Sequence, residues 1–391
     1  NEAFWIQKRV LMWAGYPRIH TLDEYFQLIE AYIQANPVNE DGTENTGFQI
    51  LCDDWRYFCL ENPPQFLAGY PNDGCAIVDP VTKKASVYDT IPEAKQYFQK
   101  LNEMYRKGII KAETFFMSYE QYLEKLSEGN VLGMVDQYWQ FMDASNMLYG
   151  KGMTDRTYVP LGIVADETLT DNYRCPDVIN SGNGLGITVS CEDVEGALQF
   201  LDDLLREDIQ ILRWWGEENV DYQVDEEGVF YRTEEQRIRA TDEKWQEENV
   251  CSYYWFPHYE GMLADGKNTV DPAQQPGEYY VTLDETDRQV LDAYGYEKWK
   301  DFLTPMEETP PWFALYTAEN NWPSDTDYGK AKKEMGEVKR EWLPKVIMSE
   351  NFEETWNAYM ADYEKRVDVD AYEEELTKEV QRRIELVNHK N

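Results

Sequence analysis

Amphipathic helices that alternate with short apolar strands are the feature that most limits how this chain can fold. In "IHTLDEYFQLIEAYIQANP" (19–37), Thr21 and Glu24 form a capping box, and apolar residues recur along one face of the helix that follows. A second helix is predicted at about 92–106. The run "NVLGMV" (130–135) is typical of a short buried strand. This order of elements recurs along the chain and predicts an α/β layered domain.

The remaining elements follow from the same signals. Residues 49–60 are predicted to start as a strand and to run into an aromatic segment. Strands or hairpins are predicted near 75–89, 157–164 and 180–190, and around a turn at Gly228. Helices are predicted at 118–128 behind a Ser118–Gln121 capping box, at 193–206, in the charged stretch that ends near 247, and behind Ser349. Residues 38–48 are predicted to be a polar loop and 251–280 an irregular aromatic segment.

Three predicted helices carry one apolar face each. The face of the 193–206 helix comprises Val194, Leu198, Leu201 and Leu205. The face of the helix after Ser349 comprises Phe352, Trp356, Tyr359 and Tyr363, and that of the last helix comprises Tyr372, Leu376, Val380 and Val387. Such spacing is typical of amphipathic helices.

The segment "NSGNGLGITVS" (180–190) contains a GxGxG pattern, which suggests a dinucleotide loop at first sight. A phosphate-binding loop of that kind needs a helix N-terminus directly after the glycines. Here the apolar residues continue as a predicted strand, and the next helix starts only near Asp193. The sequence context therefore argues against nucleotide binding.

Composition and charge exclude several classes of protein. The 391 residues suffice for two or three domains, and a 42% hydrophobic content is too high for a disordered chain. No apolar run approaches the ~18 residues of a membrane helix. The net charge of −38 repels nucleic acid and anionic lipid. It also disfavours anionic ligands, unless basic residues near a site override the field.

Cysteine and histidine usage gives no support for a metal or redox cofactor, and we expect none. The cysteines are Cys52, Cys59, Cys75, Cys175, Cys191 and Cys251, and no two of them have CxxC spacing. Buried structural thiols are the expected reading. The three histidines, His20, His258 and His389, include no HxxxH pair, so there is little material for a zinc or haem site.

Three short stretches combine aromatic rings with hydrogen-bonding groups: "DDWRYF" (53–58), "DQYWQF" (136–141) and "YYWFPHYE" (253–260). Each is explained singly by aromatic packing under a loop, but together they suit carbohydrate, whose C–H faces stack on flat rings. No GxSxG, P-loop, kinase or HExxH motif occurs. With 75 Asp and Glu residues, an acid/base pair cannot be recognised by sequence proximity, so catalysis stays open but unsupported.

Several segments, in their order, resemble extracellular solute-binding proteins of ABC importers, the class that contains maltose-binding protein. The segments are "YPRIHTLDEYFQLIEAY", "LSEGNVLGMVDQYWQF", "NSGNGLGITVSCEDVEGALQFLDDLL", "WWGEENVDYQVDEEG" and "WLPKVIMSENFEETWNAYMADYEKRVDVDAYEEELTKEVQRRI". The last two are similar to the large lipoprotein members from Gram-positive bacteria. Each motif is degenerate, and the order of the motifs over nearly the whole chain carries the resemblance.

The resemblance implies an α/β fold of the periplasmic-binding-protein-like type II, with two lobes, a hinge and a helix-rich C-terminus. Residues 1–180 would form the first part of lobe 2, 181–305 the C-terminal part of lobe 1, and 306–391 the crossing segment and C-terminal helices of lobe 2. Family members carry a lipoprotein signal, an anchoring Cys and further α/β structure before the position of Asn1, so the resemblance implies that this N-terminal segment is missing here.

Ligand would bind in a cleft between the lobes, with Trp55, Trp139 and Trp255 as stacking platforms. Asp54, Asp136, Gln137 and Asn183 would bond sugar hydroxyls. Only the segment around Trp139 matches a family binding position; the other residues rest on local composition.

The leading hypothesis is a binding protein, not an enzyme, that delivers a sugar, expected to be an oligosaccharide, to the permease subunits of an ABC transporter. It would be a monomer at the extracellular face of the bacterial membrane, lipid-anchored in its full-length form. The alternatives are a secreted carbohydrate-active enzyme that uses a cleft Asp/Glu pair, and a surface adhesion module without a transport partner.

Overall fold

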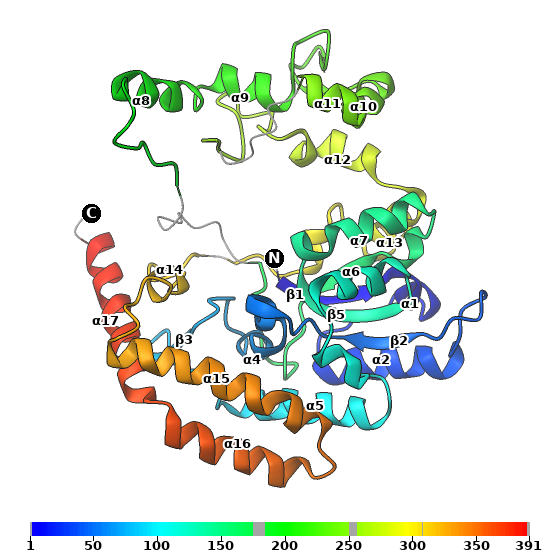
Figure 1. Cartoon of the computed structure of the whole chain (residues 1–391). Coiled ribbons are helices and arrows are strands. Elements are labelled where there is room, and N and C mark those ends of the chain that lie inside the picture. The colour runs from blue at the N-terminus through cyan, green and yellow to red at the C-terminus, as the bar shows by residue number, and fades with distance from the viewer. Residues whose placement is uncertain (1, 175–183, 250–255, 307, 389–391) are drawn as a thin grey trace. The chain divides into compact units, whose positions relative to one another are not determined.

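The computed structural model describes residues 2–174, 184–249, 256–306 and 308–388, and its elements are shown in Figure 1. The chain divides into two compact units. Unit 1 comprises Asn1–Asn180 and Gln289–Asn391, and unit 2 comprises Ser181–Arg288. Strands and helices mix in unit 1, and helices predominate throughout, which confirms the predicted α/β class with a helix-rich C-terminus. The assignment of the two units as the lobes of a binding protein, with the boundaries predicted from the sequence, stays a prediction.

A four-stranded sheet forms the centre of unit 1. Its strands are β1 (Glu2–Gln7), β2 (Thr46–Gln49), β5 (Val131–Gln137) and β6 (Tyr158–Leu161), in the order β2-β5-β1-β6. β1 runs antiparallel to β5 and β6, and β2 runs parallel to β5. This register pairs Glu2 with Gln137, so the start of β1 lies beside the end of β5.

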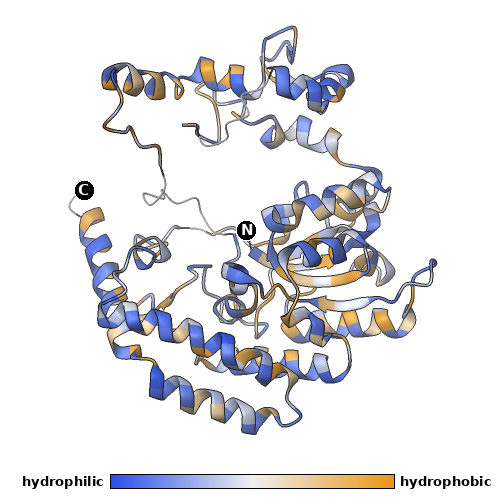
Figure 2. Cartoon of the chain, in the orientation of Figure 1, coloured by the Kyte–Doolittle hydropathy of each residue, from blue (hydrophilic) through white to orange (hydrophobic). Residues whose placement is uncertain are grey.

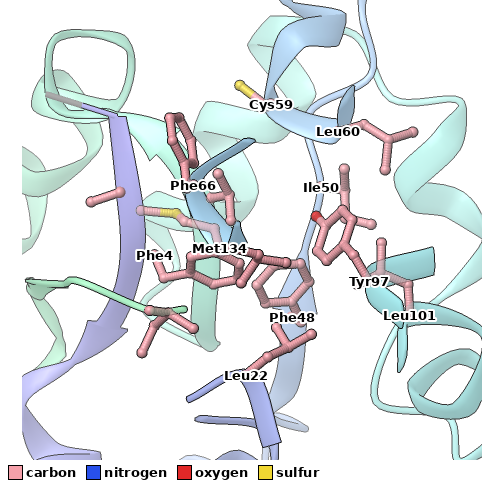
Figure 3. Packing of buried hydrophobic residues seen from close by; sticks show 14 of the residues in the cluster. Phe4, Leu22, Phe48, Ile50, Cys59, Leu60, Phe66, Tyr97, Leu101 and Met134 are labelled. Atoms are coloured by element: carbon pink, nitrogen blue, oxygen red, sulfur yellow. The ribbon is translucent and has the colours of Figure 1, made fainter. Parts of the chain in front are cut away.

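The predicted buried strand is β5, and it extends further than expected, through Asp136 and Gln137. A side chain at Gly133 would collide with the Tyr25 hydroxyl and lie within 3.1 Å of the Trp5 carbonyl oxygen. Glycine is therefore needed where α2 (Leu22–Ala35) packs closely on the sheet. Figure 3 shows the aromatic and aliphatic core around this contact, including Phe4, Phe48 and Met134.

The remaining elements of the first half of unit 1 are short helices and one hairpin. The α-helices are α1 (Lys8–Trp13), α3 (Phe58–Glu61), α4 (Pro63–Leu67), α5 (Pro92–Arg106), α6 (Tyr119–Ser127) and α7 (Tyr138–Gly150). The 3-10 helices are η1 (Asp54–Tyr57), η2 (Ala112–Phe115) and η3 (Thr154–Arg156), and the hairpin is β3 (Ile77–Val78) with β4 (Ala85–Ser86). The helices expected at 92–106 and 118–128 and the hairpin are confirmed, as are both predicted capping boxes.

The strand predicted near 49–60 is wrong in its limits. β2 begins at Thr46, inside the predicted polar loop, and ends at Gln49. The Ile50 amide donates to the Thr114 hydroxyl at 2.8 Å instead of to a neighbouring strand. The chain then turns into η1 and α3, which place the "DDWRYF" stretch on helical backbone.

Helices complete unit 1 at the C-terminus. They are α13 (Glu285–Tyr294), which crosses the unit boundary, η5 (Trp299–Phe302), α14 (Tyr316–Glu319), α15 (Asp327–Met348), α16 (Phe352–Arg366) and α17 (Val369–Asn388). α15 packs against α5, α16 and α17, as Figure 1 shows.

Two details of the predicted C-terminal helices need correction. Asn351, not Ser349, caps α16, because its side chain accepts from the Glu354 amide. Ser349 instead accepts from the Asn351 amide. In α17, Val387 is exposed, although the three residues before it on the predicted face are buried.

Unit 2 contains small helices and one hairpin. They are α8 (Val194–Asp203), α9 (Glu207–Trp214), β7 (Gln223–Val224), β8 (Phe230–Tyr231), α10 (Glu234–Ala240), α11 (Glu243–Asn249), η4 (Pro272–Gln274) and α12 (Pro276–Thr282). The hairpin at Gly228 is confirmed, with a φ of 82° at the turn. The core of unit 2 contains Trp215, which packs on Tyr222 and Phe230. Its Nε1 donates to the Thr269 carbonyl at 2.9 Å.

Three predictions for unit 2 differ from the structure. Residues 184–190 form no strand in the described part of "NSGNGLGITVS". The helix predicted at 193–206 ends at Asp203, and a separate helix, α9, follows. The charged helix is likewise divided into α10 and α11. Across the described residues of both units, no helix is long and apolar enough to cross a membrane.

Candidate functional site

The corner between β5 and α7 builds the candidate site from a buried carboxylate. Asp136 is fully buried, and its carboxylate accepts from the Tyr122 hydroxyl and the Gln137 amide, both at 2.6 Å, and from the Gln140 side chain. Burial raises the pKa of Asp136 to about 6. In this structure the carboxylate lies beneath the surface and is bonded to protein groups, and the role of Asp136 in bonding sugar hydroxyls stays a prediction.

Gln137 and Trp139 present the outer side of the same corner. Trp139 is 52% exposed, and its Nε1 donates to the Gln137 side-chain oxygen at 2.7 Å. That bond fixes the indole against the end of β5. It also leaves the Gln137 amide nitrogen, which has no partner among the described residues, as a donor for a ligand oxygen.

Trp55 comes to Trp139 from a separate part of the chain. The two rings are stacked, with centroids 5.9 Å apart and an angle of 13° between their planes, and Trp55 is 52% exposed. Asp54, beside it in η1, is exposed and has a positive φ of 49°. The structure thus brings three of the predicted site residues together, Trp55, Gln137 and Trp139, and Asp54 is the exposed neighbour of Trp55 in the chain.

Contacts from α15 hold the Trp55 turn in place. The Arg340 guanidinium donates to the Asp54 carbonyl at 2.7 Å and lies over the Tyr57 ring, 4.6 Å from its centroid. The Tyr57 hydroxyl donates to the Lys339 carbonyl at 3.3 Å. An irregular 3-10 turn is therefore tied to a long helix, which is how a loop residue acquires a defined orientation.

Arg56 is a site residue that sequence reasoning missed. Its guanidinium carbon lies 3.9 Å from the ring centroid of Tyr119 and 4.6 Å from that of Trp55. We call Tyr119, Arg56, Trp55 and Trp139 the aromatic–arginine stack. The only sequence signal was an arginine placed between two aromatic residues in "DDWRYF".

Glu2 was also missed, and it lies next to Gln137 in the sheet. One of its carboxylate oxygens accepts from Asn62 at 3.1 Å and from Asn72 at 3.0 Å. The other oxygen is buried and has no hydrogen-bond partner among the residues that the structure describes. Burial raises the pKa of Glu2 to about 8, so this carboxyl is largely protonated at neutral pH. In a chain with 75 acidic residues nothing in the sequence singles it out.

Two of the predicted site residues, Asn183 and Trp255, lie outside the described residues, and their roles stay predictions. Of the cysteines, Cys59 and Cys75 are buried thiols, and Cys52 and Cys191 are half-buried and free; Cys175 and Cys251 lie outside the described residues. Among the side chains that the structure describes, no group of three or more His, Cys, Asp or Glu residues is arranged to hold a metal ion.

No family model matches the sequence, and a search of curated proteins finds no significant match. Solved structures do match the fold. An extracellular solute-binding protein from Bifidobacterium longum subsp. infantis superposes with a TM-score of 0.62 at 13% identity, over 98% of this chain and 73% of that one. An HMO-binding, ABC-transporter-associated solute-binding protein from Bifidobacterium longum infantis gives a TM-score of 0.59 at 14% identity, over 98% and 73% of the two chains.

The ABC-transporter substrate-binding protein FusA of S. pneumoniae, an EF-hand mutant in complex with fructo-nystose, gives a TM-score of 0.59 at 14% identity, over 98% of this chain and 72% of that one. All three neighbours are described as binding proteins and none as an enzyme. The chain therefore has the fold of the solute-binding proteins of ABC transporters, which confirms the fold that the sequence segments predicted.

Proposed function

We propose that this protein binds an oligosaccharide on the Trp55–Trp139 pair and delivers it unchanged to the permease subunits of an ABC transporter. The observation that carries the proposal is the stacked pair itself, two half-exposed indoles held beside a free amide donor. Exposed tryptophans are costly in water, and aromatic faces with a few polar groups are the usual walls of a sugar site. One structural neighbour is described as HMO-binding and another as a complex with fructo-nystose, which supports a sugar as the ligand.

The same neighbours support transport as the purpose of binding, since they are described as ABC-transporter proteins. We place the protein on the extracellular side of the membrane, where such proteins collect ligand, and we propose that it acts as a monomer. Closure of the protein around a ligand would couple its affinity for the ligand to a change in its shape. The permease would then recognise the ligand-bound form.

The enzyme alternative finds less support in the site. Glycoside cleavage needs two carboxyl groups that flank the bond, about 5 to 9.5 Å apart. Asp136 is enclosed by Tyr122, Gln137 and Gln140, and Asp54 is the exposed carboxylate nearest in sequence to the Trp55 ring. Prolonged incubation with oligosaccharides, followed by product analysis, should therefore detect no cleavage.

Isothermal titration calorimetry against a panel of neutral and acidic oligosaccharides tests the proposal. At least one ligand should bind, and Trp139→Ala should lower its affinity by at least about tenfold, as expected for a central aromatic contact. Trp13→Ala is the matched control, because Trp13 is 48% exposed and packs on Tyr32, away from the stacked pair. Binding that survives Trp139→Ala, or tight binding of peptides and no glycan, would refute the proposal.

A further inference from the structure

Arg56 is a half-buried cation inside the aromatic–arginine stack. Contacts with the faces of Tyr119 and Trp55 attract a guanidinium without using its N–H donors. They also restrict a long side chain whose ordering would otherwise cost entropy when a ligand binds. The cation is therefore oriented before any ligand arrives.

The side-chain donors of Arg56 are unused within the described part of the chain, where its guanidinium makes no hydrogen bond and no ion pair. The Arg56 Nε atom is buried without an acceptor among the described residues. The two terminal nitrogens also have no acceptor there, but they are not fully buried, so a ligand can reach them. Arg366 shows the opposite arrangement, since its guanidinium contacts the carboxylates of Glu334, Glu337, Glu341 and Asp362.

In a chain with 75 acidic and 37 basic residues, the oriented Arg56 guanidinium thus forms no ion pair among the described residues and lies beside the two exposed, stacked indoles. The fork of a guanidinium matches a carboxylate, which accepts two parallel N–H bonds from it. A uronic acid unit supplies a carboxylate directly on a sugar ring, and its ring or its neighbour supplies the face that stacks on tryptophan.

We propose that the site selects an acidic oligosaccharide, in which a uronate carboxylate pairs with Arg56 while a sugar ring stacks on the Trp55–Trp139 pair. This assignment rests on the proposed function, because both use the same indoles. It names the class of sugar, whereas the proposed function names only a sugar.

The net charge of −38 repels an anionic ligand, but this repulsion acts only over a short distance. Exposed charges are screened beyond about 8 Å at physiological ionic strength, whereas a guanidinium and a carboxylate meet at about 2.8 Å. Of the two carboxylates beside Trp55, Asp53 accepts from the Tyr119 amide at 2.9 Å, and Asp54 is exposed. Asp54→Asn should therefore strengthen the binding of an acidic sugar relative to that of its neutral counterpart.

Calorimetry on the whole chain, with matched ligand pairs, tests the assignment. The probes are oligosaccharides of galacturonate, mannuronate and glucuronate, each compared with its carboxyl-reduced, neutral counterpart. At least one uronate should bind about tenfold or more tightly than its counterpart, which is the range for a hydrogen bond to a charged group. Arg56→Gln should bring that ratio close to one, and Arg56→Lys, which keeps the charge but not the fork, should give an intermediate ratio.

The ratio of the two affinities separates selectivity for the acid from structural support of the site. An arginine that only holds Trp55 in place would affect the binding of the acidic and of the neutral sugar equally. Equal loss for both sugars in Arg56→Gln would overturn the assignment, as would a wild-type protein that binds the neutral sugar as tightly as the acid. Either result would leave the proposed function standing if Trp139→Ala still lowered the affinity for the sugar by at least about tenfold. Absence of any sugar binding would overturn both.

Discussion

The two units bury their predicted helical faces to very different extents. In unit 1, α16 buries all four aromatic residues of its predicted face: Phe352, Trp356, Tyr359 and Tyr363. In unit 2, α8 leaves Val194 and Leu198 exposed and none of its residues is buried, and Leu205, which follows the helix, is exposed as well. Figure 2 shows hydrophobic residues along the helices of both units. Periodicity therefore predicts a helix and its apolar stripe, whereas burial depends on what packs against the stripe.

Unit 1 also contains buried acids. Burial raises the pKa of several carboxyl groups in unit 1: Glu2, Asp73, Asp89, Asp136 and Glu373. A core that is dense enough to bury aromatic faces also removes water from carboxylates. Unit 1 should therefore account for a large part of the response of the fold to both core mutation and pH.

The largest expected effect comes from Trp356 in α16. Its ring stacks on Phe352 at 5.8 Å and contacts Tyr359 at 5.3 Å and Phe98 at 6.0 Å, and it is only 4% exposed. Trp356→Ala should lower the free energy of unfolding by about 3 to 5 kcal/mol, through lost burial and the cavity left behind. Urea unfolding followed by far-UV circular dichroism measures it. A loss below about 1 kcal/mol would remove the contrast between the units.

A smaller effect, dependent on pH, is expected from Glu2. The pKa of Glu2 is about 8 in the folded protein against an ordinary value of 4.5, so between these values the folded state holds a proton that the unfolded chain releases. Its contribution to stability is present at low pH and is lost as pH rises toward 8. Glu2→Gln removes that loss, since glutamine cannot ionise.

Urea unfolding at about pH 5 and about pH 8 checks this prediction. Relative to the wild type, Glu2→Gln should gain more than about 1 kcal/mol of stability between the two pH values, because one pKa unit corresponds to about 1.4 kcal/mol. The exposed Glu40→Gln is the matched control. An equal response of the two variants would show that Glu2 is not buried as a neutral acid.

The smallest effect is expected in α8. Leu198 is 55% exposed, so Leu198→Ala removes little buried surface and replaces leucine with a good helix former. The free energy of unfolding should change by no more than about 0.5 kcal/mol. Urea unfolding of this variant beside Trp356→Ala gives the contrast directly, and a loss comparable to that of Trp356→Ala would mean that the α8 stripe is covered in solution.

Local signals predicted much of unit 1 from the sequence. The capping boxes at Thr21 and Ser118 placed two helix starts correctly, because a cap is a contact between near neighbours in the chain. The Gly133 position was also predictable, since a glycine in a buried strand indicates close approach of another backbone or side chain. The predictions at Gln49 and Ser349 each misplaced one end of an element, the end of β2 and the start of α16. At such positions two residues compete as the helix cap or as the hydrogen-bond partner.

The site was only partly predictable, because its geometry depends on contacts between distant segments. Trp55 and Trp139 were both identified, but only the fold shows that their rings stack. Asp136 looked like a ligand group because it adjoins Trp139, yet the alternation of a strand turns its carboxylate inward to Tyr122. Arg56 had no distinctive signal, since the rings that hold it come from its neighbour in sequence and from Tyr119.

Hydroxyl-radical footprinting with mass spectrometry tests the central claim most directly, because it reports which tryptophans a sugar covers. With a bound oligosaccharide, oxidation of Trp55 and Trp139 should fall several-fold, while that of Trp13, similarly exposed at 48%, should stay unchanged. The contradictory result would be a sugar that binds but leaves Trp55 and Trp139 as reactive as in the free protein.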